Sequence, residues 1–299
     1  MTDRVRSSSP LPWLAGLAVV PLVLLALVDA DPLATFARNW AITPLAFFAA
    51  AFANATAIGG GFVFVPLFIF VYAFEPIAAL QLSLGTQAFG MSSGALGWSR
   101  RFIDVRALAL AVAFASLGML IGSFAWVPSP LEVKAVFGWV SVVIAAAVTL
   151  EIRFGSRADA EQMPSLGPLD LLGFGIASLL GGIVTAWVSL GIGEVVALYL
   201  VFRHRVRIEK AIGTGVAALA LCSVLGFAIH ATRSFAVFPW QSLAFTVPGV
   251  LLGGFSGARA GRWLEAKMLE RGRKSPLKTI FAVVVLLDGI VMLIHVHLH

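Results

Sequence analysis

Two glycine-rich stretches interrupt apolar segments of this sequence, and their backbone could bind an anion. The first is AIGGGFVFVPLFIF (57–70) and the second is SLGIGEVVALYLVF (189–202). Glycine is a poor helix former, so each stretch predicts a break in a helix. The first amides of a half-helix that follows a break lack intrahelical partners and lie at the positive end of the helix dipole, which favours anion binding. The glycines concerned are Gly59, Gly60, Gly61, Gly191 and Gly193.

Glu194 directly follows Gly193, the last glycine of the second stretch, and is the candidate for proton chemistry. A carboxylate in an apolar segment is costly and marks a functional hypothesis by default. The start of a helix favours its ionised form, which would compete with a bound anion, whereas burial favours its protonated form. We hypothesise that Glu194 takes up a proton when the anion binds. The alternative, a carboxylate that only caps the half-helix, stays open.

Polar side chains near the breaks could add donors to such a site. Each could instead make an interhelical hydrogen bond, which is common in membrane proteins. The single cysteine, Cys222, excludes an intrachain disulfide. We expect no metal and no cofactor. The predicted substrate-binding set comprises the five glycines with Asn54, Thr56, Gln87, Ser189 and Thr214.

The composition indicates the environment of these residues. Sixty per cent of the 299 residues are hydrophobic, 12% are charged, and the mean hydropathy is +0.96. A soluble domain is about a quarter charged. The chain is therefore predicted to be an all-α polytopic membrane protein. Its net charge of +6 is expected to mark cytoplasmic loops and not a nucleic-acid partner.

Two of the apolar segments are too long to be one ordinary spanning helix, which needs about 20 residues. These are 43–74 and 170–203, and both contain a glycine-rich break. The apolar run near the N-terminus is read either as a cleaved signal peptide or as a retained first helix, and the second reading is preferred. The other predicted segments are 14–28, 77–98, 105–127, 131–151, 208–230, 241–262 and 278–296.

The two long segments begin similar series of motifs. LGTQA (84–88) aligns with IGTGV (212–216), and LGMLIGS (117–123) aligns with PGVLLGG (248–254). Internal duplication is a recurrent plan of secondary transporters. The predicted organisation is an N-terminal segment with a first transmembrane helix (1–42), a first repeat (43–151), a cytoplasmic linker (152–169) and a second repeat (170–299).

The basic residues favour a topology in which both long segments enter and leave the membrane on one side. With a cytoplasmic N-terminus, this places 18 of the 21 Lys and Arg inside and leaves Arg38, Lys134 and Arg233 outside. The expectation is two re-entrant, broken helices, about seven full spans and inverted repeats in the cell inner membrane. A competing arrangement has an external N-terminus, with 43–74 crossing and only 170–203 re-entering.

The sequence resembles the TauE/SafE (TSUP) family of sulfite and organosulfonate exporters. The resemblance is carried by AIGGGFVFVPLFIF with LGTQA in one half, and by GIGEVVALYLVF with AIGTGV in the other. It implies a transporter of sulfite, sulfoacetate or a related small sulfur oxyanion, usually outward. Two positions depart from the family pattern, since Glu194 replaces an apolar or glycine residue and Leu198 replaces the proline.

The resulting functional expectation is a secondary transporter exporting a small sulfur oxyanion with proton coupling. The alternatives are import of another small anion and an anion channel. An enzyme is not expected, because the HExxH pattern is absent from the sequence. The partners are the small anion and the lipid bilayer. Whether the protein forms a homo-oligomer is left open. One face of the segment 241–262 could serve an oligomer or only internal packing, and it consists of Gly249, Gly253, Gly257 and Gly261.

Overall fold

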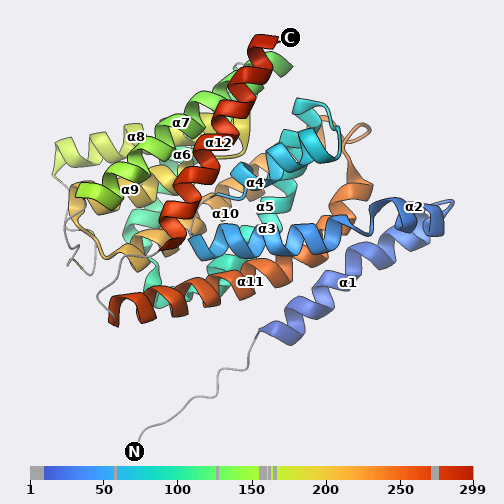
Figure 1. The fold of residues 1–299 in the computed structure, drawn as a ribbon, viewed down its shortest axis with the longest axis horizontal. Coiled ribbons are helices and arrows are strands. Elements are labelled where there is room, and N and C mark those ends of the chain that lie inside the picture. The colour runs from blue at the N-terminus through green and yellow to red at the C-terminus, as the bar shows by residue number, and fades with distance from the viewer. Residues whose placement is uncertain are drawn as a thin grey trace, which may run out of the picture.

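The computed structural model describes residues 10–56, 59–125, 128–154, 160, 163, 167–270 and 276–298, and almost all of them are helical (Figure 1). The only β contact among them is an isolated bridge between Ala160 and Val206. The expected all-α class is therefore confirmed. The helices are α1 (Leu11–Val28), α2 (Pro32–Asn39), α3 (Ile42–Thr56), α4 (Gly61–Pro66), α5 (Pro76–Trp98), α6 (Val105–Phe124), α7 (Pro130–Phe154), α8 (Pro168–Val188), α9 (Ile192–His204), α10 (Ile208–Arg233), α11 (Trp240–Glu270) and α12 (Pro276–Leu298), with a π-helix η1 (Leu67–Val71) and a 3₁₀-helix η2 (Arg100–Phe102).

Local sequence explains where several of these helices begin. Proline, which needs no amide partner, lies in the first turn of α2, α5 and α8. The Asp104 carboxylate caps α6 by accepting hydrogen bonds of 3.1 Å from the amides of Arg106 and Ala107. Ser129 and Glu132 bond reciprocally at the start of α7, at 2.7 and 3.3 Å, as a capping box does.

Five of the described helices are long and apolar enough to cross a membrane, namely α6, α7 as far as Leu150, α8, α10 and α11 as far as Met268. A multi-pass membrane protein is thus confirmed, while the count of seven full spans stays a prediction. The short helix α2, next to the start of α3, was not among the predicted segments. α11 extends eight residues beyond its expected end at residue 262.

The segment 42–71 forms a first hairpin, in which α3 runs one way and α4 with η1 returns. Gly249 of α11 meets the backbone of Thr43, and Gly261 meets that of Ala55, so α3 and α11 are parallel. α5 is also parallel to α11, because Gly90 faces Val250 and Gly97 faces Ala258. α3 and α5 therefore begin at the same end of the bundle, and the chain between them must turn back.

Pro66 does not end the returning arm of this hairpin. The helix continues past it as η1, in which the Tyr72 amide bonds to the Leu67 carbonyl at 3.3 Å. Proline removes an amide from the helical ladder, and a π-type turn accommodates the altered hydrogen bonding. The interruption of the apolar segment therefore lies at the glycines and not at the proline.

Residues 168–204 form a second hairpin from α8 and α9. The Arg203 guanidinium at the end of α9 pairs with the Asp170 carboxylate at the start of α8, at 2.7 Å. The two ends of this hairpin therefore lie together. α8 runs parallel to α6, since Gly118 packs on Leu179 and Gly122 on Ala186.

The two hairpins have opposite orientations in the bundle. α10 is antiparallel to α5, because Gln81 bonds Ser234 at 3.3 Å while Gly85 meets Phe227. α10 begins at the same end as α6, where the Thr214 hydroxyl accepts a hydrogen bond of 2.8 Å from the Asp104 amide. α6, α8 and α10 thus begin at one end, and α3, α5 and α11 begin at the other.

The glycine ladder on α11 packs inside the bundle, where it lies against α3. A Cβ at any of its positions would collide with the α3 backbone. α8 packs along α6 through small residues in the same way, so each hairpin rests on a helix that follows the other hairpin in the chain. The four glycines face the carbonyls of Thr43, Phe47, Ala51 and Ala55.

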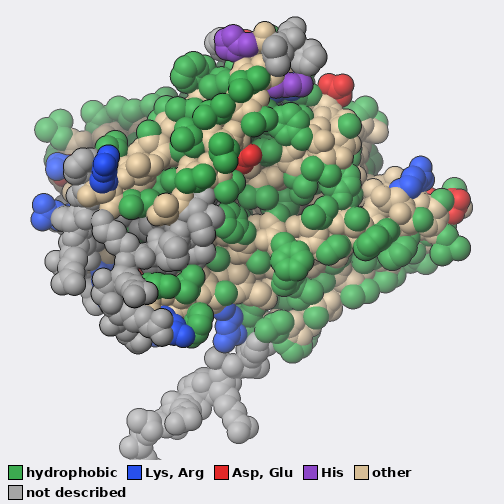
Figure 2. All heavy atoms as spheres, viewed as in Figure 1, with side chains coloured by type: hydrophobic (Ala, Val, Ile, Leu, Met, Phe, Trp, Pro, Cys, Tyr) green, Lys and Arg blue, Asp and Glu red, His purple; other side chains and the backbone are tan. Residues whose placement is uncertain are grey.

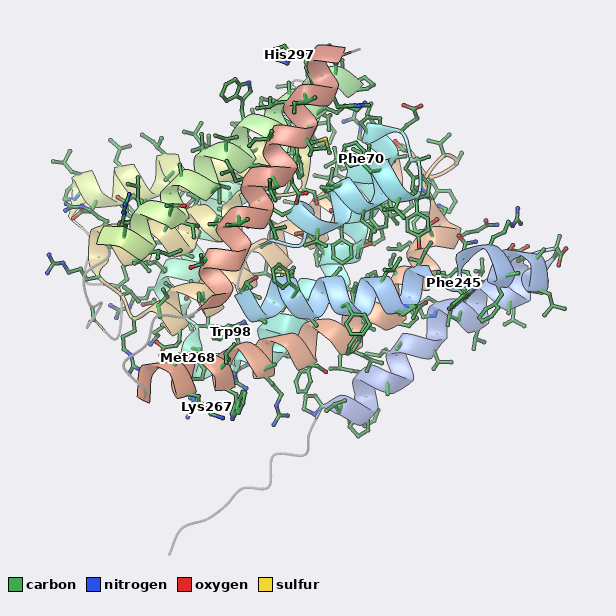
Figure 3. The ribbon with its side chains drawn as sticks, in the orientation of Figure 1. Phe70, Trp98, Phe245, Lys267, Met268 and His297 are labelled. Atoms are coloured by element: carbon green, nitrogen blue, oxygen red, sulfur yellow. The ribbon has the colours of Figure 1, made fainter. Side chains whose placement is uncertain are left out.

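The surface agrees with a membrane location. Figure 2 shows a broad apolar surface over the middle of the molecule, with Lys and Arg side chains gathered mainly at the end where α11 finishes. In Figure 3, Lys267 and Met268 mark that end and Phe245 lies at the opposite end beside α2. Large side chains such as Trp139 and Val143, 62% and 63% exposed, suit contact with lipid.

Candidate anion-binding site

The two glycine-rich breaks meet inside the bundle around the Glu194 carboxylate. The Gly59 amide donates to Glu194 Oε1 at 2.5 Å, and the Gly191 amide donates to Oε2 at 3.0 Å. Glu194 is only 3% exposed. One buried carboxylate therefore accepts one hydrogen bond from the break of each hairpin.

The chain reversal between α8 and α9 needs unusual backbone conformations. Ser189 ends α8 in the left-handed region with φ of 62°, and Gly191 follows with φ of 127°. The second of these is rarely accessible to residues with a side chain. α9 then begins at Ile192, and Glu194 falls in its first turn.

The first break approaches the second so closely that side chains are excluded. A Cβ on Gly61 would overlap the Ser189 carbonyl oxygen, and one on Gly59 would lie 2.8 Å from Glu194 Oε1. α4 begins directly at Gly61. The glycines thus serve both the break and the contact between hairpins.

A polar cluster from α5 adjoins the meeting point. Gln87 Nε2 donates to the Ser189 carbonyl at 2.8 Å and also to the Ser189 hydroxyl. The Ser189 hydroxyl donates to Ser83 Oγ at 2.9 Å. All three residues are at most 1% exposed. We call the set Gly59, Ser83, Gln87, Ser189, Gly191 and Glu194 the junction.

The charge balance of the junction comes from backbone dipoles. None of its six residues is basic, and the N-terminus of the 13-residue helix α9 adds positive potential near Glu194. Hydrogen bonds from amides to an ionised acceptor are among the stronger ones in proteins. The junction can therefore hold a compact anionic group by neutral donors alone.

The remaining predicted glycines border the junction. Gly60 precedes α4, its carbonyl accepts from the Phe64 amide at 2.8 Å, and an added Cβ would lie 3.1 Å from Gln87. Gly193 lies in the first turn of α9, and an added Cβ would be 3.3 Å from the Gly215 carbonyl of α10. Both positions are restricted by close packing.

Three predicted residues make other contacts. The Asn54 amide donates to the Ala50 carbonyl at 3.0 Å, and the Thr56 hydroxyl to the Phe52 carbonyl at 2.8 Å, both within α3. Thr214 bonds Asp104 near the start of α6. The structure does not bring these three into the junction, and their part in binding stays a prediction.

Sequence reasoning left Ser83 out of the predicted set. The spacing of Ser83 and Gln87, one helical turn apart, was an available signal, since residues at i and i+4 share a helix face. Among the described residues, no three His, Cys, Asp or Glu side chains come close enough to hold a metal ion.

Comparison with known proteins identifies the family. The family described as Sulfite exporter TauE/SafE matches residues 42–292, which include both hairpins and the helices after them. No curated protein and no solved structure matches the chain. Members of the family are membrane transporters of sulfite and related anions, not enzymes. The chain belongs to the TauE/SafE sulfite exporter family.

Proposed function

We propose that this protein is a secondary transporter that exports a small sulfur oxyanion, such as sulfite, sulfoacetate or a related organosulfonate, and that the junction holds the anion. The observation that carries the proposal is the pair of amides, from Gly59 and Gly191, that converge on the two oxygens of the Glu194 carboxylate. Two separate hairpins already bind one anionic group there.

The chemistry of the ligand follows from this arrangement. A sulfite or sulfonate group presents neighbouring oxygens that can accept the same two amides once Glu194 withdraws. The Gln87 side-chain amide packs against Gly60 and supplies a neutral donor, and the Ser83 hydroxyl, which accepts from Ser189, keeps its own proton to donate. Buried donors that are left unpaired are costly, which disfavours uncharged ligands lacking acceptors. The close backbone approach favours a compact anion.

In this proposal, Glu194 couples binding of the anion to uptake of a proton. An ionised carboxylate and an anionic substrate repel each other strongly in a site of low dielectric. A proton taken up by the Glu194 carboxylate removes its charge and releases the two amides to the substrate. In this mechanism the proton and the anion occupy the protein together, and the resting site is closed by the protein's own carboxylate.

The opposite orientations of the two hairpins support alternating access. Inverted repeats place a substrate site where broken helices meet, so that either half can open it. We assign 43–151 and 170–299 as the repeats, with the basic end and the N-terminus in the cytoplasm and both hairpins re-entrant in the inner membrane. An inside-negative potential drives net negative charge outward by about 2.3 kcal/mol per charge per 100 mV, so a doubly charged anion that leaves with one proton is still driven outward.

The test is exchange of radiolabelled sulfite and sulfoacetate in proteoliposomes, with and without a pH gradient. Wild-type protein should catalyse saturable exchange that the gradient accelerates. Glu194→Gln should retain binding but lose the response to the gradient. Glu209→Gln is the matched control, because Glu209 begins α10 near Arg207 at 3.6 Å and lies outside the junction.

Three results would contradict parts of the proposal. Full gradient dependence in Glu194→Gln would remove Glu194 from proton coupling. Electrogenic flux at near-diffusive rates would indicate a channel, which uses the same dipoles without a change of protonation. Absence of sulfite and sulfoacetate exchange in the wild type would exclude these substrates.

A further inference from the structure

A cavity with a few polar groups in its lining lies between α5, α6, α7, α8 and α10, separate from the junction. Its volume is about 200 Å³, enough for a small oxyanion with some of its water. It opens at the end of the bundle where α6 and α10 finish and α5 begins. The described lining residues are Ile77, Leu80, Gln81, Gly122, Ser123, Pro128, Val133, Ala186, Trp187, His230, Arg233 and Ser234.

The polar groups of this cavity suit an anion. Arg233 is the only Lys or Arg among the described lining residues, and none of these is acidic. Its guanidinium lies 4.8 Å above the Phe124 ring and donates one hydrogen bond, of 2.5 Å, to the Ser123 carbonyl. A guanidinium has five donors, so this contact uses only part of its capacity.

Two buried polar atoms in the lining have no hydrogen-bond partner among the described residues. These are the hydroxyl oxygen of Ser123, a residue 4% exposed, and Nε2 of His230. Buried polar atoms are normally paired, so unpaired ones in a cavity indicate water or a ligand. The Ser123 hydroxyl and the Arg233 guanidinium come from different helices and line the same space.

The cavity adjoins the junction along two helices. Leu80 of the lining lies three residues before Ser83 and seven before Gln87, so these three residues share one face of α5. Trp187 of the lining is followed two residues later by Ser189. An anion that enters at this end therefore passes the cavity next to the polar cluster of the junction.

We propose that this cavity is a second anion subsite, in which Arg233 binds the sulfur oxyanion on its way between the junction and the bundle end where α10 finishes. The identity of the ligand rests on the proposed function, whereas the existence of an anion site rests on the cavity itself. In the present conformation the Glu194 carboxylate fills the junction, so the cavity is the site that a free anion meets.

Binding of sulfite to the purified full-length protein, measured by calorimetry without oxygen, tests the subsite directly. Arg233→Gln should weaken binding about tenfold, the effect of losing one charge-assisted hydrogen bond. Arg233→Lys should recover part of the affinity. Arg38→Gln is the matched control, because Arg38 is an exposed arginine near the same end that bonds only within α2. Thermal unfolding of each variant verifies folding.

Transport in membrane vesicles of both orientations provides the second readout. Arg233→Gln should raise the half-saturating sulfite concentration on the face where α10 ends and leave it unchanged on the other face. A purely structural defect would alter both faces equally. Unchanged binding and unchanged half-saturation in Arg233→Gln would overturn the subsite.

The two proposals fail in different ways. Arg233-dependent binding without any transport by the wild type would retain the subsite and reject the proposed function. Transport that depends on Glu194 but not on Arg233 would retain the proposed function and reject the subsite.

Discussion

Glu194 and Gly59 are 135 residues apart in the sequence, yet the Gly59 amide donates a 2.5 Å hydrogen bond to the Glu194 carboxylate. The bond joins the two hairpins at their breaks, inside the bundle. Because the same carboxylate also accepts from Gly191, movement of either hairpin must lengthen or break one of the two bonds. Opening of the site and release of Glu194 are therefore linked.

Gly191→Ala should reduce both stability and transport. The native φ of 127° strains any residue with a side chain by about 1–3 kcal/mol, and the added methyl would lie 3.1 Å from Val184. Thermal unfolding in detergent and sulfite exchange measure the two effects. Gly16→Ala is the control, because nothing lies within 4 Å of its added methyl, and it should be neutral or slightly stabilising. Equal behaviour of the two variants would show that the reversal tolerates a side chain.

Gln87→Leu should impair sulfite binding while preserving the fold. The change removes the donor to the Ser189 carbonyl and hydroxyl at nearly constant side-chain volume. The free energy of sulfite binding should become less favourable by about 1–3 kcal/mol. The half-saturating concentration for exchange should rise accordingly. Gln241→Leu is the control, since Gln241 is exposed and bonds only Asp29, at 3.3 Å. If Gln87→Leu transports with wild-type affinity, the polar cluster is structural only.

Gly257→Leu should destabilise the protein. Even a methyl there would overlap the Ala51 carbonyl of α3, so a larger side chain must separate α3 from α11. Overpacking in a tight interface costs about 1–3 kcal/mol and sometimes more. Folded yield and melting temperature should both fall, whereas Gly16→Leu on α1 should leave them near wild type. A normal melting temperature for Gly257→Leu would mean that the α3–α11 contact is looser than described.

Single cysteines should reveal the hairpin formed by α8 and α9. In a Cys222→Ser background, an impermeant maleimide should modify Leu169→Cys and Arg203→Cys from the same face of the membrane. It should modify Leu33→Cys and Val237→Cys, at the other end of the bundle, only from the opposite face. These four native residues are exposed and Cys222 is buried. Labelling of positions 169 and 203 from opposite faces would mean that the segment crosses the membrane.

Much of the helical framework could be predicted from the sequence, because apolar length and glycine clusters act locally. The segment 105–127 became α6 (Val105–Phe124), and 77–98 became α5 (Pro76–Trp98). The two glycine clusters predicted breaks, and the described residues on either side confirm that separate helices begin at Gly61 and Ile192. Prolines and capping side chains explain where several of these helices begin.

The partners of polar side chains could not be predicted from the sequence. Asn54 and Gln87 are both buried amides on apolar helices, yet Asn54 donates to the Ala50 and Gly90 carbonyls, at 3.0 and 3.5 Å, whereas Gln87 reaches Ser189. Helix rotation and crossing decide such contacts, and these depend on packing of the whole bundle. The same holds for Glu194. The sequence indicates that it lies at the start of a helix, but its contact with Gly59 depends on the packing of the two hairpins.

The packing of α3 on α11 and of α8 on α6 has a consequence for biosynthesis. When the ribosome has delivered the first half, α3 still lacks the glycine-lined surface that it will eventually cover, because that surface belongs to a helix made much later. The first half therefore cannot complete its packing until α11 has been synthesised.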